Sequence, residues 1–167
     1  GKGSKIAVGS DVRLSSDSLK RSLISGLTSV GCSAVDIGEV PSPVLYYAPI
    51  RLNLDGGVMV TASHLPPEWN GFKTCDSSGI VLSEGTGLEK VREIFFSGKF
   101  GLNSQGKVES SNLIEDYVNF VSSKISLKKK MRIVLDLANS VASLAAPKIL
   151  KRLGAEVISI HEELDGR

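Results

Sequence analysis

The stretch that decides the fold class runs from Lys5 to Thr61 and begins KIAVGSDVRLSSDSLKRSLISGLTSVGCSAVDI (Lys5–Ile37). Its first six residues form a short apolar run that is typical of a buried strand. An amphipathic helix follows, with Asp17 as its predicted cap and Gly31 as its predicted stop. A second strand is predicted over Ala34–Ile37. Strands that alternate with helices indicate an α/β protein.

Further along, the pattern predicts another helix and a strand, followed by a hairpin. The helix covers Val44–Leu52, with a kink or break at Pro49 because proline cannot donate to the helical ladder. A buried strand follows over Gly57–Thr61. The two strands of the hairpin are predicted at Gly71–Cys75 and Gly79–Leu82.

The next segment predicts two helices around a polar loop. The helices cover Leu88–Phe96 and Leu113–Ile125, and the loop is rich in Gly, Ser and Asn over Ser97–Ser111. A strand–helix–strand unit then follows, with strands at Met131–Asp136 and Ala155–Ile160. Its helix is expected to begin at a cap, Asn139 or Ser140, and to end near Leu153.

These elements predict two units joined by a short linker. We expect a first domain over residues 1–125, a linker over 126–130, and the truncated start of a second domain over 131–167. The first strand comes almost at once, and the last unit is too short to close a core of its own. We therefore expect the chain to be a fragment of a larger protein.

Composition excludes several classes of protein. The 167 residues carry a net charge of +2, so nucleic acid is not expected as a partner. The two cysteines, Cys32 and Cys75, cannot form a disulfide scaffold and suit a reducing cytosol. No apolar stretch reaches 18 residues and no signal peptide opens the chain, so no membrane partner is expected. We expect a cytoplasmic protein.

Three loops follow buried strands and are the places where ligands gather in open α/β sheets. They read DVRLSS after KIAVGS, ASHLPPEWNGFK after GVMVT, and LANSVAS after MRIVLD. The second loop is the richest in reactive groups. Ser63 and His64 stand directly beyond the strand, two prolines stiffen the loop, and Lys73 lies where the chain returns to the sheet.

Each of these residues also has an ordinary interpretation. Ser63 could be a surface or capping hydroxyl, His64 a hydrogen-bonded loop histidine, Lys73 a solvated amine and Arg13 a surface ion pair. A Ser63–His64 dyad has poor geometry because neighbouring side chains of an extended segment point apart. Together, Arg13, Lys73 and the helix that follows the third loop could surround a hydroxyl with positive groups. A phosphorylated serine and a phosphosugar would require such a setting.

The loop TASHLPPEWNGFK (Thr61–Lys73) resembles the phosphoserine loop of the α-D-phosphohexomutases, whose usual form is TASHNPxxxNGxK. Three further stretches match this family in order and spacing: VGSDVRLSS (Val8–Ser16), DIGEVPSP (Asp36–Pro43) followed by DGGVMVTASH, and VLDLANSVAS…APKILKRLGAEVI (Val134–Ile158). The resemblance covers nearly the whole chain. It implies a three-layer α/β/α sandwich with a mixed sheet, the family's domain I without its N-terminal strand. The opening βαβ of a second, similar domain would follow.

The resemblance also implies an activity. Such enzymes move a phosphoryl group between C1 and C6 of a hexose phosphate, of mannose or glucose, through a hexose 1,6-bisphosphate. Ser63 would carry the phosphoryl group, and Mg²⁺ would bind it through a phosphoryl oxygen. Arg13 would support its charge with a fork of donors. Lys73 and His64 would move protons to and from the hydroxyls.

Several of the family's features are missing or changed. The acidic metal loop, the sugar-reading loop and the substrate-phosphate site are absent, so the chain alone is expected to be inactive. It is expected to self-associate through the strands of its second unit, or to be disordered after about Lys130. Leu65 stands where Asn is common, and Ser140-Val141-Ala142 replaces Gly-Ala-Gly, which puts a tight glycine turn in doubt. Asp165-Gly166-Arg167 is interpreted as a strand-end loop and not as the metal loop.

Two other functions remain open on the residues alone. One is a serine hydrolase that uses Ser63, although the chain has no G-x-S-x-G elbow. The other is a non-catalytic α/β binding module.

Overall fold

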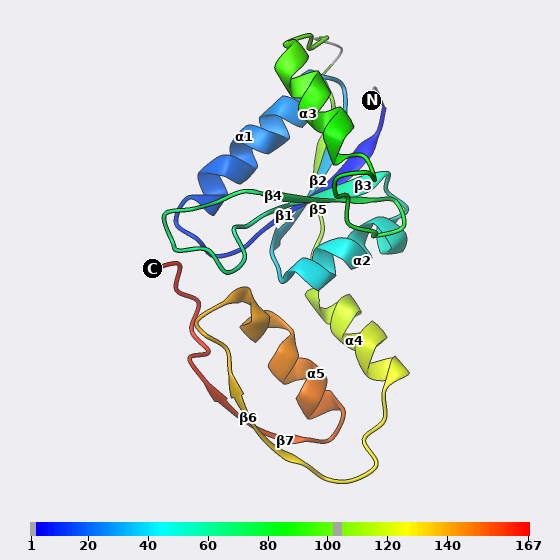
Figure 1. The fold of residues 1–167 in the computed structure, drawn as a ribbon. Coiled ribbons are helices and arrows are strands. Elements are labelled where there is room, and N and C mark those ends of the chain that lie inside the picture. Colours follow the sequence, from blue (N-terminus) through cyan, green and yellow to red (C-terminus); the bar gives the residue numbers. More distant parts are fainter. Residues whose placement is uncertain (1–2, 102–104) are drawn as a thin grey trace.

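The computed structural model describes residues 3–101 and 105–167, which form a larger unit and a smaller one (Figure 1). The larger unit is built on a five-stranded sheet in the order β4-β3-β1-β2-β5. Its strands are β1 (Lys5–Ser10), β2 (Ser33–Glu39), β3 (Gly56–Val60), β4 (Phe72–Asp76) and β5 (Val108–Ser110). All neighbours are parallel except β4, which runs antiparallel to β3. The expected mixed sheet is confirmed.

Helices α1 (Ser16–Ser29) and α2 (Ser42–Leu52) cover opposite faces of this sheet. Successive residues of a strand face opposite sides. In β2, Asp36 accepts a hydrogen bond from Lys20 of α1 at 3.1 Å, whereas Ile37 joins the buried cluster that contains Leu45 of α2. The helix–sheet–helix order is visible in Figure 1 and confirms the three layers.

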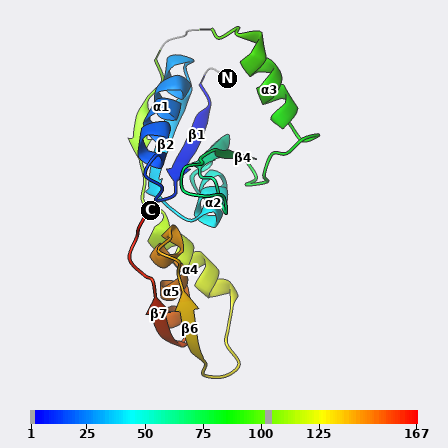
Figure 2. The same ribbon diagram turned by 60° about the vertical axis from the view of Figure 1, so that its left-hand side comes forward.

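The core lies between the sheet and α2. Its buried residues come from the strands, from α2 and from the connections around them: Ala7, Val35, Ile37, Val40, Val44, Leu45, Ala48, Leu54, Met59 and Leu113. In contrast, α3 (Leu88–Ser97) stands away from the sheet in Figure 2 and contains no buried residue.

The smaller unit contains two parallel strands with helices on one side. Its elements are α4 (Ile114–Lys124), β6 (Arg132–Asp136), the 3₁₀ helix η1 (Val141–Leu144), α5 (Ala146–Arg152) and β7 (Glu156–Ile160). The predicted strand–helix–strand unit is confirmed, but its single helix is two helices separated at Ala145. Pro147 lies in the first turn of α5, where its missing N–H costs nothing.

Helix α4 contacts both units. Its Glu115 accepts a hydrogen bond from Lys148 of α5 at 2.6 Å, while Asp116 pairs with Arg51 of α2. The Tyr47 ring of α2 also meets the Tyr117 ring at 5.6 Å between centroids. The expected boundaries at 125 and 131 stay a prediction, because α4 is held from both sides.

Two further elements differ from the prediction, and so does the start of α1, which begins at Ser16 with Ser15 and not Asp17 as its N-cap. Within the loop predicted over residues 97–111, of which 102–104 lie outside the described residues, β5 pairs with β2, Val108 opposite Ala34. The second hairpin strand at Gly79–Leu82 is reduced to a single bridge between Cys75 and Val81. Within the described residues, no helix is long and apolar enough to cross a bilayer.

Candidate active site

The candidate site begins where β1 and β3 end. These strands are neighbours, and the chain leaves β1 for β2 on one side and later returns to β3 on the other. Such a reversal opens a crevice at the carboxyl ends of the strands. The Asp11 N–H donates to the Val60 carbonyl at 3.0 Å, so the loops over residues 11–15 and 61–71 lie together.

Ser63 has an unusual backbone conformation in the second of these loops. Its φ is +56°, in the left-handed region that residues other than glycine seldom occupy. The Thr61 hydroxyl accepts a hydrogen bond from the Ser63 N–H at 3.0 Å and supports this conformation. Ser63 is exposed, and its hydroxyl bonds to no other residue in the described part of the chain. The hydroxyl is therefore available for reaction.

Ser63 lines a cavity of about 460 Å³ between the two units. The first unit contributes Asp11, Val12, Arg13, Thr61, Ser63, His64, Leu65 and Pro67, and the second contributes Ala138, Asn139, Ser140, Val141, Asp165, Gly166 and Arg167. The loop after β6 thus converges on the loop of Ser63, as the sequence predicts. The second unit makes a close backbone contact here, since a Cβ on Gly166 would fall 2.1 Å from the Val12 carbonyl oxygen.

Of the other predicted site residues, His64 lies in the cavity lining and Lys73 lies outside it. His64 lines the cavity and is exposed. Lys73 is half-buried on β4 opposite Met59 and is not part of the lining. Lys73 forms no hydrogen bond or ion pair with the described residues, so its amine is unpaired in this part of the chain.

Arg13 is fully engaged by protein atoms. Its Nε donates to Asp11 Oδ2 at 3.2 Å, and the other four bonds go to carbonyl oxygens of the Ser63 loop. The four distances are 2.7 Å to Pro66, 3.1 Å to Trp69, 3.1 Å to Ser63 and 2.6 Å to Leu65. The Arg13 side chain is only 12% exposed. The sequence predicted a fork of donors toward a phosphoryl group, and the structure directs that fork to the loop backbone.

A second anchor ties the two loops together. Asn70 Nδ2 donates to the hydroxyls of Ser15 and Ser16, each at 2.9 Å. Ser16 in turn donates to Asp11 Oδ1 at 2.5 Å. Sequence reasoning did not single out Asp11 or Asn70. The signal was present, because Asn70-Gly71 is a turn dipeptide and Asp11 precedes Arg13 by two residues.

The turn after β6 forms without glycine. Ala138 and Asn139 have φ of +47° and +53°, while Ser140 is extended and caps η1 with its side chain. The predicted cap at Ser140 is confirmed. The Asp136 carboxylate accepts from the Ala138 N–H at 3.0 Å. This bond, together with the His161 ring, holds the pKa of Asp136 below its usual value.

The segment Asp165–Arg167 forms a loop, as predicted, and it also closes one side of the cavity, which was not predicted. The Asp165 N–H donates to the Asn139 carbonyl at 2.9 Å. The Arg167 guanidinium bonds to the Asp165 carboxylate at 3.0 Å and lowers its pKa.

The residues at hand do not fit a Mg²⁺ site. Within residues 3–101 and 105–167, no group of three or more His, Cys, Asp or Glu side chains could hold a metal ion. The Asp11 carboxylate is already used by Arg13 and Ser16.

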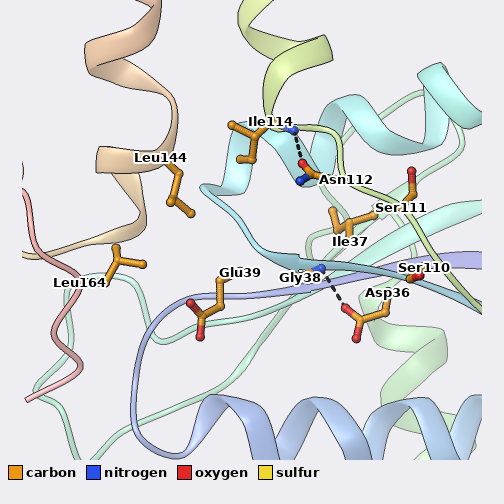
Figure 3. Close-up of a pocket in the computed structure, with 10 residues that line it drawn as sticks. All are labelled: Asp36, Ile37, Gly38, Glu39, Ser110, Ser111, Asn112, Ile114, Leu144 and Leu164. Carbon is orange, nitrogen blue, oxygen red and sulfur yellow. Dashed lines mark hydrogen bonds between the residues drawn. The ribbon is translucent and has the colours of Figure 1, made fainter.

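A larger cavity, of about 530 Å³, lies at the ends of β2 and β5 (Figure 3). Its polar lining includes Asp36 and Glu39, and no lysine, arginine or histidine lines it. Asp36 Oδ1 accepts from the Gly38 N–H at 2.8 Å, as Figure 3 shows. Since acidic groups repel a phosphorylated ligand, the smaller cavity around Ser63 is the better candidate site.

Comparison with known proteins identifies relatives of this chain. The family model described as phosphoglucomutase/phosphomannomutase, alpha/beta/alpha domain I, matches residues 1–101. A phosphoglucomutase/phosphomannomutase of Thermococcus kodakarensis is 37% identical over 173 residues, covering 96% of this chain and 37% of the relative. A phosphoglucosamine mutase of Nautilia profundicola is 39% identical over 169 residues, covering 97% and 38%.

A solved structure also matches nearly the whole chain. The crystal structure of a phosphoglucomutase/phosphomannomutase family protein from Burkholderia thailandensis superposes with a TM-score of 0.86 at 30% identity. The match covers 98% of this chain and 37% of that one. The chain therefore spans between a third and two-fifths of the length of the relatives that it matches.

Proposed function

The chain belongs to the phosphoglucomutase/phosphomannomutase family, and on that basis we propose that Ser63 carries the phosphoryl group in a phosphosugar mutase. The reaction would move a phosphoryl group between C1 and C6 of a hexose phosphate through a hexose 1,6-bisphosphate. The relatives are phosphoglucomutase/phosphomannomutase and phosphoglucosamine mutase by name, which supports a hexose phosphate as the class of substrate.

The observation that carries this proposal is the state of Ser63. Its hydroxyl is exposed on a loop whose backbone is held on both sides, by Thr61 at the N–H and by Arg13 at the carbonyl. It opens into a cavity formed by both units. An unpaired hydroxyl on a held backbone suits transfer because the backbone keeps the serine beside the cavity.

A sugar hydroxyl attacks the phosphorus of phosphorylated Ser63. The new sugar O–P bond forms as the bond from phosphorus to Ser63 Oγ breaks, and the proton of the sugar hydroxyl passes to Ser63 Oγ. In the return step, Ser63 Oγ attacks the other phosphorus of the sugar bisphosphate, the bond from that phosphorus to the sugar oxygen breaks, and the proton passes from Ser63 Oγ to that sugar oxygen. We assign the proton movements to Lys73 and His64, since both lie near the loop and have no partner among the described residues. Arg13 belongs to the same proposed site.

We include Mg²⁺ in the proposal only as an ion bound to the phosphoryl group on Ser63. The phosphoryl oxygens would be ligands of the ion, and the protein ligands would come from sequence outside this chain. When bound, the ion would neutralise charge on the phosphoryl oxygens.

We also propose a cytoplasmic location without a nucleic-acid or membrane partner. The chain has only two cysteines, Cys32 and Cys75, and both are buried, which supports a reducing compartment.

The test is a turnover assay of the full-length gene product with glucose 1-phosphate and mannose 1-phosphate. We expect interconversion with the 6-phosphate, a loss of turnover in Ser63→Ala, and normal turnover in the matched control Ser77→Ala, which changes an exposed serine of the β4 turn. The 167-residue chain alone should be inactive, because the contacts expected outside it supply much of the positioning. Turnover by this chain above its Ser63→Ala variant would contradict that expectation.

The two other functions give different results in the same samples. A serine hydrolase would bind a fluorophosphonate probe at Ser63, whereas a mutase would hold phosphate there. A binding module would show neither modification nor turnover.

A further inference from the structure

The guanidinium of Arg13 has no donor left for a ligand. A guanidinium has five N–H groups. Here one bonds to Asp11 and the other four bond to the carbonyls of Ser63, Leu65, Pro66 and Trp69. An arginine that binds phosphate presents its fork to the phosphate oxygens. Arg13 could do so only after it released the loop.

Besides Arg13, the loop is held by Asn70, which bonds to Ser15 and Ser16, and by a few bonds of its own. Between β3 and β4 its own backbone bonds include Leu65 N–H to the Ala62 carbonyl at 3.1 Å and Trp69 N–H to the Pro66 carbonyl at 3.0 Å. Pro66 and Pro67 have no N–H to donate. The four carbonyls point toward one centre, and a single charged group satisfies all of them.

Ser63 needs such support. Its positive φ is costly for a residue with a Cβ and persists only where neighbours impose it. Arg13 Nη2 bonds to the carbonyl of Ser63 itself, so the two peptide groups around the serine are fixed. Asp11 completes the arrangement because its carboxylate receives both the backbone N–H and the Nε of Arg13.

We propose that Arg13 is a positioning residue: it fixes the loop so that the Ser63 hydroxyl faces the cavity, and it does not bind the phosphoryl group. The expected effect of Arg13 on turnover rests on the proposed function. The expected effect of Arg13 on the loop rests only on the hydrogen bonds described above. Removal of Arg13 should therefore loosen the loop and slow the chemical step while substrate affinity changes little.

The test compares Arg13→Lys and Arg13→Ala with Arg51→Ala in the full-length gene product. Arg51 is a matched control, because it also pairs with an aspartate, Asp116, but lies on α2 away from the Ser63 cavity. For each variant, hydrogen exchange is measured by mass spectrometry on the peptide that covers residues 62–71. The kcat and KM for the hexose phosphate are measured in parallel, and thermal unfolding verifies the fold.

We expect exchange in residues 62–71 to rise about tenfold or more in both Arg13 variants. The kcat should fall about 100-fold or more while KM stays within about threefold. Lysine should rescue little, since a point charge with three donors cannot hold four spread carbonyls. Arg51→Ala should leave both exchange and kcat unchanged.

Two results would overturn the proposal. One is unchanged exchange together with a KM that rises about tenfold, which identifies a phosphate ligand. The other is an Arg13→Lys variant with normal exchange and normal kcat. If Arg13→Ala does not fold, the exchange and kcat of Arg13→Lys alone test the proposal. If no sample shows turnover or phosphate on Ser63, the proposed function fails, and the exchange comparison still decides whether Arg13 holds the loop.

Discussion

The side chains in and near the Ser63 loop are of two kinds: free groups, which have no hydrogen bond or ion pair, and engaged groups, which are bonded to other residues. The Ser63 hydroxyl and the Lys73 amine have no partner among the described residues, whereas Arg13, Asp11 and Asn70 are bonded. Free groups can exchange protons or a phosphoryl group without breaking the structure. The engaged groups keep the free ones in place.

At Lys73 this division gives a prediction about catalysis. Lys73→Met in the full-length gene product should lower kcat by roughly 10²–10⁴, the usual size of a lost acid–base contribution. The free energy of unfolding should change by less than about 0.5 kcal/mol, because the amine has no partner to lose. Steady-state kinetics and urea unfolding measure the two effects.

The control for Lys73 is Lys90→Met on the exposed side of α3. A Lys73→Met enzyme that matches Lys90→Met in kcat and in its pH–rate profile would remove Lys73 from the proposed chemistry.

The sequence predicted the places of Ser63 and His64 better than it predicted the groups that hold their loop. Ser63 and His64 follow a buried strand directly, so their place at a sheet end could be predicted. The four carbonyl partners of Arg13 could not, because they lie 50–56 residues away in the sequence and meet Arg13 only when two loops pack together.

At the scale of elements, β3 and β4 approach each other where glycine is required. A Cβ on Gly56 would fall 2.6 Å from the Cys75 carbonyl oxygen. We predict that Gly56→Ala destabilises the protein by about 1–3 kcal/mol through overpacking. Gly26 in α1 has open space, so Gly26→Ala should stabilise by about 0.5–1 kcal/mol. Urea unfolding of both variants checks this pair, and equal effects would contradict it.

The attachment of α4 should depend on pH. Hydrogen bonding to Lys148 lowers the pKa of Glu115, and hydrogen bonding to Arg51 lowers the pKa of Asp116. A carboxylate whose folded pKa is lowered stabilises the fold above its unfolded pKa, about 4, and loses this effect as pH falls through the folded pKa. The urea midpoint should therefore fall below about pH 4.

The double variant Glu115→Gln, Asp116→Asn tests this dependence. It should lose less stability between about pH 5 and about pH 3 than the unmodified chain does. Glu162→Gln serves as a control, because this carboxylate forms no ion pair among the described residues. An acid profile of the double variant that overlays the unmodified one would contradict the prediction.

Elements with strong apolar patterns were predicted well, and weak ones were not. The strand β5 has three exposed residues, so its sequence carries no burial signal, and only its pairing with β2 reveals it. The helix after β6 divides because Ala145 leaves helical geometry before α5 begins at Ala146. Both outcomes depend on tertiary contacts.

At the scale of the whole molecule, the two units meet around the cavity and leave one sheet face open. On β6 and β7, Val134 is 67% exposed and Ile158 is 46% exposed. We predict that the 167-residue chain self-associates at micromolar concentration through this two-stranded sheet. Sedimentation should show oligomers that Val134→Lys returns to monomer. A strict monomer, with strong exchange protection over residues 132–135, would contradict this.

The most direct measurement of the central claim is the phosphate content of Ser63. The full-length gene product is incubated with glucose 1,6-bisphosphate, and intact mass and peptide mapping then locate the added group. We expect one phosphoryl group on Ser63, its absence in Ser63→Ala, and its presence in Ser77→Ala. A Ser63→Ala protein that still carries a phosphoryl group and still interconverts hexose phosphates would contradict the assignment of Ser63 as the phosphoryl carrier.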